Sequence, residues 1–204
     1  MKRGLFIVID GLGGSGKSTQ MELLKKRLKK AVFTKEPGGA PRAERIRDIL
    51  KAGDGGALDP LTDFFLFWAA RAEHMTALIK PALMKGKTVF CDRFDSSTFA
   101  MQVRGEGQKN LEKFFWECRE ATLGKFEPDL YIILDTPYGL AKDRRTGRKE
   151  GEDRFDERGE DYQRKVRAGY KEFAKKVSGH IIDSSQGPDD IHAQIWRIVE
   201  KKIR

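Results

Sequence analysis

Apolar residues follow two different spacings along this chain. Some lie in short, almost continuous runs, which predict five buried strands: GLFIVID, AVFT, KTVFCD, DLYIILD and GHIID. Elsewhere they recur three or four positions apart, which predicts helices. The predicted helical segments are 18–30, 42–51, 61–86, about 108–123, a segment that runs through Tyr170, and about Asp189 to the C-terminus.

The order of these segments predicts the fold class. Strands that alternate with helices favour an α/β architecture, here a five-stranded parallel sheet with helices on both faces. The 204 residues contain no internal repeat and no linker, so residues 1–204 are expected to form a single domain. The segment RRTGRKEGEDR has almost no apolar residue and is expected to be a mobile surface segment rather than core.

A glycine-rich loop follows the first predicted strand. It matches G-x-x-x-x-G-K-[ST] and leads into a predicted helix, which is the context this motif requires. Its glycines let backbone N–H groups converge on a phosphate at the positive end of that helix. The lysine would bind the β- and γ-phosphates of ATP, and the serine hydroxyl would hold Mg²⁺. The predicted ATP-binding residues are Gly11, Leu12, Gly13, Gly14, Ser15, Gly16, Lys17, Ser18 and Thr19.

Two carboxylates lie at the ends of apolar runs. Asp10 ends the first run and Asp92 ends the third. In a parallel sheet both would open onto the same edge, where ligands of such folds bind. Mg²⁺ prefers oxygen ligands, so both aspartates are candidates to lie near the ion. Strand-end aspartates also cap following helices, and that alternative stays open for each of them.

Charge and cysteine content narrow the class of protein. The net charge of +9 attracts polyanions, which makes a nucleic-acid-binding ATPase one alternative. The chain has no zinc-finger spacing and no RNA-binding aromatic signature, so no nucleic-acid partner is expected. No run approaches the ~20 apolar residues that span a bilayer, so no membrane partner is expected either. Cys91 and Cys118 have no metal-like spacing, which fits reduced packing residues and a cytoplasmic location.

Later motifs make the chain resemble the bacterial thymidylate kinases from the first strand to the last helix. The family's T-R-E-P-G-G loop corresponds to TKEPGG at 34–39, and its L-F-x-A-x-R helix corresponds to LFWAAR at 66–71. Its D-R-Y-x-D-S-S-x-A-Y-Q segment corresponds to DRFDSSTFAMQ at 92–102. Three more motifs match in the same order, as Glu44-Arg-Ile-Arg47, DRFD at 153–156 and KVRAGY at 165–170.

The resemblance implies a P-loop NTPase kinase fold and a reaction. The enzyme would use ATP and Mg²⁺ to phosphorylate dTMP, giving dTDP and ADP. A kinase for another nucleotide, such as dUMP, remains an alternative, as does the nucleic-acid-binding ATPase. The family also implies a short mobile lid at about 144–156 and a homodimer formed through helix packing, for which the apolar stretch 61–84 is the candidate.

The resemblance also implies an acceptor site. Arg47, Arg71 and Arg93 match arginines that bind the acceptor 5′-phosphate, a task that suits the bidentate guanidinium group. Phe67, one helical turn before Arg71, matches the aromatic residue that stacks on thymine. Thr98 and Gln102 match residues that hydrogen-bond the base, and Met101 matches the residue beside the sugar. Glu36 and Asp92 match acidic residues of the site, and Asp92 is expected, with Ser18, to lie near the metal ion. Asp10 is a further expected substrate-binding residue.

Arginines of the expected lid form a second group. Phosphoryl transfer needs positive charge on the migrating group, often from an arginine on a moving element. One family subtype carries that arginine in the phosphate loop, but the loop positions 12–15 are uncharged here. The chain therefore resembles the subtype in which the lid supplies it. The predicted catalytic residues are Lys17, Arg93, Arg145, Arg148 and Arg154, and Arg144 is a predicted ATP-binding residue.

Two departures from the family concern the acceptor sugar. The third phosphate-loop residue is usually acidic and faces the sugar, whereas here it is Gly13. The Tyr that crowds the 2′ position is replaced by Met101, which is more flexible. We therefore expect weaker rejection of ribonucleotides than in a relative that has both residues. We also expect Gly13→Glu to lower the KM for dTMP if there is room for the carboxylate.

Overall fold

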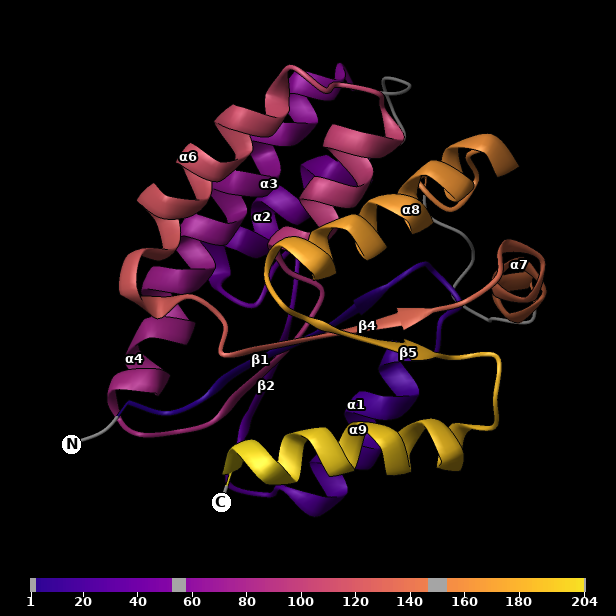
Figure 1. The fold of residues 1–204 in the computed structure, drawn as a ribbon. Helices are drawn as coiled ribbons and strands as arrows, with labels where there is room; N and C mark the ends of the chain where they lie inside the picture. The colour runs from indigo at the N-terminus through magenta and orange to yellow at the C-terminus, as the bar shows by residue number, and fades with distance from the viewer. Residues whose placement is uncertain (1–2, 53–57, 147–153, 204) are drawn as a thin grey trace.

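The computed structural model describes residues 3–52, 58–146 and 154–203. Five parallel strands form one sheet in the order β2-β3-β1-β4-β5 (Figure 1). Their bounds are β1 (Phe6–Gly11), β2 (Val32–Lys35), β3 (Val89–Asp92), β4 (Leu130–Asp135) and β5 (His180–Asp183). The five-stranded parallel sheet and the α/β class expected from the sequence are confirmed.

Helices cover both faces of this sheet. They are α1 (Lys17–Arg27), α2 (Pro41–Lys51), α3 (Pro60–His74), η1 (Met75–Ile79), α4 (Lys80–Met84), α5 (Asp95–Thr98), η2 (Phe99–Gly105), α6 (Leu111–Leu123), η3 (Gly124–Phe126), α7 (Tyr138–Thr146), α8 (Glu160–Lys176) and α9 (Pro188–Ile203). Figure 1 shows α1 and α9 together on one side of the sheet, with α2, α3, α6 and α8 on the other.

The strands feed two separate cores because successive side chains point to opposite faces of a sheet. Phe6 and Val8 enter a core built with α3, α6 and α8. Ile7 and Ile9 enter a second core built with α1 and α9. Burial of each such side chain contributes roughly 1.5–3 kcal/mol. The first strand is therefore held on both faces, which fixes the start of the glycine-rich loop that follows it.

The helix predicted at 61–86 is present but is not uniform. It consists of α3, the π-helical turn η1 and α4. The wide turn lies directly before Pro81, whose ring lacks an N–H and would clash with the carbonyl four residues earlier. Widening the preceding turn relieves that conflict. The helix ends at Met84, and Gly86, which the sequence placed at this helix end, follows the C-cap residue with a positive φ of 72°.

Two helical segments were not predicted, and one extends further than predicted. Residues 95–105 are helical because the serines at the start of α5 bond to the end of β1, which is a tertiary effect. α7 contains Gly139 and follows Pro137, so its local sequence signal is weak. Its buried Ala141 packs against the glycine-rich loop and α8. α8 continues to Lys176, past the Tyr170 that the sequence indicated.

The charged segment expected on the surface is only partly described. Residues 147–153, including Arg148, lie outside the described residues. Arg145, at the end of α7, is only 3% exposed, so at this residue the expectation of a surface segment is wrong. It is buried because its guanidinium group finds polar partners in the glycine-rich loop. Within the described ranges, no helix is long and apolar enough to cross a membrane.

Candidate active site

The glycine-rich loop joins β1 to α1 at the carboxyl edge of the sheet. β1 lies between β3 and β4, so the strand order reverses there and a crevice is expected. Gly14 and Gly16 have φ angles of 83° and 93°, a region that residues with a Cβ rarely adopt. α1 begins at Lys17, directly after Gly16. The backbone N–H groups at this helix end are available to an anion, as the motif predicts.

Lys17 lies folded over its own loop. Its Nζ donates to the carbonyl oxygens of Gly11 at 3.1 Å and Leu12 at 2.9 Å. Burial, together with the nearby positive charge of Arg93, lowers the pKa of Lys17 to about 8. Phosphate oxygens would replace the carbonyl contacts and would favour the charged ammonium. The loop thus holds a buried cation whose hydrogen-bond acceptors are neutral groups of the same loop, two carbonyls and the Ser15 hydroxyl.

The Asp10 carboxylate already accepts several hydrogen bonds from the protein itself. Its carboxylate accepts hydrogen bonds from Ser96 Oγ at 2.6 Å, Ser97 Oγ at 2.9 Å and the Phe94 N–H at 3.3 Å. It also accepts from the N–H of Gly11 at 2.8 Å. This arrangement ties the end of β1 to the start of α5, whereas the capping alternative expected Asp10 to cap the helix that follows its own strand, α1, which has no side-chain cap bond. The role of Asp10 in substrate binding stays a prediction.

Asp92 differs from Asp10. Across the described ranges its carboxylate accepts no hydrogen bond and forms no ion pair within 4 Å. Burial raises the pKa of Asp92, and the nearby charges of Lys17 and Arg93 oppose that rise. Ser18 is exposed at the mouth of the loop. The two predicted metal-binding residues therefore keep their oxygen atoms available.

Arg93 links the glycine-rich loop to two helices. Its Nη1 donates to the Gly11 carbonyl at 3.1 Å, to Ser97 Oγ at 3.2 Å and to the Tyr170 hydroxyl at 2.9 Å. Its φ of 66° is unusual for a residue other than glycine, Asn or Asp. Such a conformation costs on the order of 1–3 kcal/mol and persists only where the surroundings impose it. This guanidinium group thus lies between the glycine-rich loop, which is the predicted donor half of the site, and the predicted acceptor half.

Arg71 is the centre of the predicted acceptor half. It is 1% exposed, and its guanidinium lies 4.6 Å from the Trp68 ring and 5.1 Å from the Phe94 ring. Its Nε donates to Glu36 Oε2 at 2.9 Å, and its Nη2 donates to Thr98 Oγ1 at 3.2 Å. In the part of the chain that the structure describes, Nη1 has no hydrogen-bond partner. A buried donor of this kind is normally paired, so it points to a missing ligand.

The other predicted acceptor residues have different surroundings from Arg71. Arg47 Nη1 donates to the Pro37 carbonyl at 2.6 Å. Gln102 is 1% exposed, and neither its amide nitrogen nor its amide oxygen has a partner among the described residues. The ring of Phe67 lies 5.9 Å from that of Phe155, and Met101 packs against the apolar cluster that contains both rings. The predicted base site is thus apolar apart from one unpaired amide.

The predicted lid arginines have different surroundings. Arg145 Nη1 donates to the Gly13 carbonyl of the glycine-rich loop at 3.1 Å. Arg144 Nη1 donates to the Ser184 carbonyl at 2.8 Å, at the end of β5. Arg154 donates to both carboxylate oxygens of the buried Asp63 on α3, at 2.9 and 2.5 Å, and its Nε donates to the Leu50 carbonyl at 2.7 Å. Of the three lid arginines that the structure describes, Arg145 alone bonds to the loop that would hold the transferred phosphate.

Asp156 occupies the space next to Gly13. A Cβ added to Gly13 would lie 2.0 Å from Asp156 Oδ1. Sequence reasoning assigned no role to Asp156, although it ends the matched DRFD motif. The room that Gly13→Glu would need is taken, so the condition attached to that expectation is not met. A carboxylate is present beside the loop, but it comes from the segment before α8.

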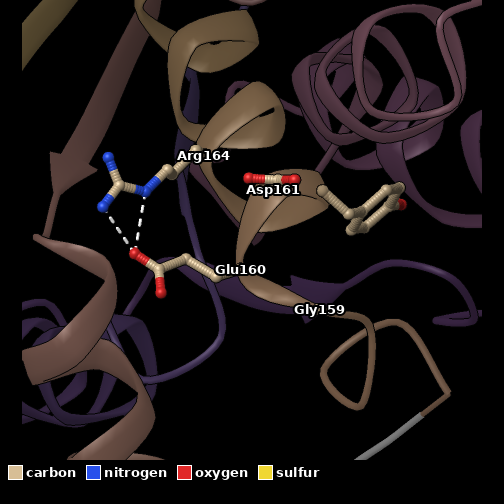
Figure 2. A pocket seen from close by; sticks show the side chains of 5 residues that line it. Gly159, Glu160, Asp161 and Arg164 are labelled. Atoms are coloured by element: carbon tan, nitrogen blue, oxygen red, sulfur yellow. Dashed lines mark hydrogen bonds and ion pairs between the residues drawn. The ribbon is translucent and has the colours of Figure 1, made fainter.

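One open pocket lies away from these residues, at the start of α8. It is lined by Gly159, Glu160, Asp161, Tyr162 and Arg164 (Figure 2). Figure 2 shows Arg164 paired with Glu160, and its Nε donates to Glu160 Oε1 at 2.8 Å. Both side chains are exposed and lie four residues apart on the helix, so they form an ordinary surface pair. None of the predicted site residues lines this pocket.

Known proteins match both the sequence and the fold. A sequence model of the thymidylate kinase family matches residues 9–195, which include the glycine-rich loop and the acceptor half. The chain belongs to the thymidylate kinase family. The thymidylate kinase of Jannaschia sp. strain CCS1 is 40% identical, over 98% of this chain and 97% of the relative. The thymidylate kinase of Ruegeria pomeroyi is 37% identical, over 96% of this chain and 94% of the relative.

The fold of a solved thymidylate kinase is similar to the fold of this chain. The crystal structure of the enzyme from Ehrlichia chaffeensis matches with a TM-score of 0.77 and 29% identity, covering 97% of this chain and 99% of that one. As a member of the family, the enzyme transfers a phosphoryl group from ATP to dTMP and gives dTDP. The resemblance, the kinase fold and the reaction expected from the sequence are confirmed. The two alternatives are not favoured.

Proposed function

We propose that this thymidylate kinase holds dTMP between Arg71, which binds the 5′-phosphate, and Gln102, which hydrogen-bonds the base. One observation carries the proposal. Among the described residues, Arg71 Nη1 and both polar atoms of the Gln102 amide are buried without partners. A phosphate oxygen would satisfy the first, and a pyrimidine edge with one donor and one acceptor would satisfy the second. Arg47, Thr98 and Glu36 support the phosphate end.

Thymine fits the apolar wall of this site. Phe67 would stack on the ring, and Met101 and Phe155 already pack beside Phe67. Aromatic contacts of this kind add about 0.5–1.5 kcal/mol beyond the area that they bury. The 5-methyl group of thymine would add apolar contact that dUMP lacks, so we infer a preference for dTMP over dUMP. One methyl group supports discrimination of about 10- to 200-fold at most.

We infer that Lys17, Arg93 and Arg145 supply the positive charge for phosphoryl transfer. Lys17 and Arg145 both contact the glycine-rich loop, and Arg93 lies between that loop and the acceptor half. Charges fixed in advance around the migrating group stabilise the transition state without reorganisation. Arg145 is the only described lid arginine bonded to this loop. Arg148 and Arg154 remain catalytic candidates from the sequence, and Arg144 remains a candidate ATP contact.

Mg²⁺ would bind next to Ser18 and Asp92. When bound, the ion neutralises charge on the β- and γ-phosphate oxygens. The unpartnered Asp92 carboxylate and the exposed Ser18 hydroxyl suit a hard cation, directly or through water. Within the described ranges no three His, Cys, Asp or Glu residues form a metal site, so most ligands would come from nucleotide and water.

We propose that the enzyme is a cytoplasmic homodimer that pairs through 61–84. Exposed apolar side chains along α3 and α6 support this, because Phe65 is 49% exposed and its ring lies 5.9 Å from that of the half-exposed Phe114. Phe65→Glu should give monomers in light scattering, whereas Ile203→Glu on α9 should not. A dimer that survives Phe65→Glu would place the interface elsewhere.

The acceptor assignment is tested with a panel of nucleoside monophosphates. ADP release is measured with ATP, Mg²⁺ and dTMP, dUMP or ribothymidine monophosphate. We expect the highest kcat/KM with dTMP. We also expect Gln102→Leu to raise the KM for dTMP and for dUMP by about the same factor, because the two bases present the same hydrogen-bonding edge. An unchanged KM for dTMP in Gln102→Leu would contradict the proposed base contact.

A further inference from the structure

A chain of buried polar groups lies behind the proposed phosphate contact. His74, at the end of α3, is 0% exposed. Its Nδ1 lies 3.1 Å from Glu36 Oε1, and its Nε2 lies 2.8 Å from Thr34 Oγ1 on β2. Glu36 in turn accepts from Arg71. Neither His74 nor Thr34 belongs to the phosphate or base contacts described above.

The hydrogen-bond roles in this chain are set by chemistry. A carboxylate can only accept, so His74 Nδ1 must carry the proton that is shared with Glu36. In a neutral imidazole ring Nε2 then accepts, and the Thr34 hydroxyl donates to it. Both ring nitrogen atoms of His74 thereby have a hydrogen-bond partner. A leucine would fill the same space without any desolvation cost, so the ring is not explained by packing alone.

His74 decides how Glu36 meets Arg71. A free carboxylate and a guanidinium group tend to form two parallel bonds that use both oxygens. Here His74 occupies Oε1, and both Nε and Nη2 of Arg71 meet Oε2, at 2.9 and 2.8 Å. Thr98 also accepts from Nη2. Nη1 is the group left over, and it is the one without a partner in the described structure.

The surrounding backbone holds this arrangement in place. The Glu36 N–H donates to the Asp92 carbonyl at 3.0 Å, which fixes the loop after β2. Gly39, with a φ of 80°, passes directly over the ring, since a Cβ there would lie 2.4 Å from His74 Nε2. His74 lies three residues after Arg71 and thus on the same helix face. The imidazole ring is therefore clamped between β2, α3 and the loop.

We propose that His74, oriented by Thr34, is a positioning residue for the acceptor phosphate. It binds Glu36 Oε1, confines Arg71 to Oε2 and so leaves Arg71 Nη1 directed at the 5′-phosphate of dTMP. The inference rests on the proposed role of Arg71. It assigns His74 no contact with substrate and no proton transfer.

The test compares variants of His74 by their separate affinities for dTMP and ATP. His74→Leu removes both bonds, and we expect the Kd for dTMP to rise about tenfold or more while the Kd for ATP changes less than about twofold. His74→Asn keeps a donor near the Nδ1 position and should restore most of the dTMP affinity. Met75→Leu changes the next residue of the chain, which lies in η1 and packs in the apolar core, and it should change neither Kd.

A double-mutant cycle tests whether His74 acts through Glu36. In a Glu36→Gln background, adding His74→Leu should change the dTMP Kd far less than in the natural protein. Equal losses of dTMP and ATP affinity, or fully additive losses in the cycle, would overturn the proposal in favour of simple packing. If His74→Leu does not fold, Thr34→Val, which removes only the hydroxyl, should raise the dTMP Kd by a few fold. An unchanged Kd in that variant would count against the proposal.

Failure of this inference is distinct from failure of the acceptor site itself. Arg71→Gln should weaken dTMP binding whatever holds the arginine. If Arg71→Gln has no effect, the proposed phosphate contact is wrong. If Arg71→Gln weakens binding but His74→Leu and Thr34→Val do not, only the positioning role is wrong.

Discussion

The proposed donor and acceptor halves of the active site are built in different ways. The donor half is one continuous segment, 11–18, whose lysine bonds to its own loop carbonyls. The acceptor half is assembled from the loop after β2 and from α2, α3, α5 and η2, and among the described residues it retains buried polar atoms without partners. A site made from one loop can satisfy its polar groups within that loop. A site made from several elements is held rigid by its own hydrogen-bond network and leaves the ligand-binding atoms unpaired.

The largest effect is expected from breaking the donor half. Lys17→Ala removes the charge that would bind the β- and γ-phosphates, so kcat should fall by about 10²–10³-fold or more. The dTMP affinity and the melting temperature should change little, because the hydrogen bonds that Lys17 donates to described residues stay within its own loop. Lys25→Ala, an exposed lysine on the same helix, is the control. Near-normal turnover in folded Lys17→Ala protein would refute the assignment of the donor site.

The lid arginines should separate into a catalytic and a structural residue. Arg145→Ala should lower kcat by about 10²-fold with a modest change in KM, because Arg145 reaches the phosphate loop. Arg154→Ala instead leaves Asp63 buried without its charge partner, and it should destabilise the fold by about 3–5 kcal/mol. Steady-state kinetics and chemical denaturation of both variants measure the two effects. The reverse result would move the catalytic role to Arg154.

Two buried glutamines provide a direct test of the acceptor half. Gln102→Leu removes an amide without a partner among the described residues, so stability should hold or rise while the KM for dTMP increases about tenfold. Gln163 is equally buried but donates to the Phe155 carbonyl at 2.6 Å. Gln163→Leu should therefore cost about 1–3 kcal/mol of stability. Equal destabilisation by both changes would mean that Gln102 has a structural partner.

The affinity for ATP should depend on pH through Lys17. Its pKa of about 8 in the free enzyme means that the ammonium is present below pH 8 and lost above it. Since phosphate binds the charged form, ATP affinity should fall roughly five- to tenfold between pH 7.5 and pH 9. Binding at pH 8 should also take up protons, which calorimetry in buffers of different ionisation enthalpy detects. Lys17→Arg stays protonated and should flatten this profile, whereas an equally steep profile would assign the titration to another group.

The smallest effects are expected where the two halves meet, at the acceptor sugar. Gly13→Glu is now expected to raise the KM for dTMP by a few fold, because Asp156 fills the space beside Gly13. In an Asp156→Ala background the same change should be better tolerated. Met101→Tyr should sharpen the preference for dTMP over ribothymidine monophosphate. If Met101→Tyr leaves the ratio of kcat/KM for the two acceptors unchanged, another residue is responsible for excluding the 2′-hydroxyl group.

The sequence by itself determined the sheet, its helical layers and the position of the glycine-rich loop between a strand and a helix. Each of these depends on residues close together along the chain: apolar runs, helical spacing, and one motif between a strand and a helix. The resemblance extended this to Arg71, Phe67 and Gln102, whose burial agrees with ligand-facing roles. The sequence did not predict α7 or the helical segment 95–105, because their stability comes from contacts with the loop and with Asp10.

Only the tertiary structure decided which charged side chains meet. Two matched arginines, Arg145 and Arg154, look alike in sequence but bond to Gly13 and Asp63, respectively. Asp156 stands beside Gly13, and His74 holds Glu36, although neither pair is close along the chain. The spacing of apolar and polar residues along a sequence indicates local backbone geometry and burial. Partners of long side chains depend on how the helices pack on the sheet, and that packing brings together residues dozens of positions apart.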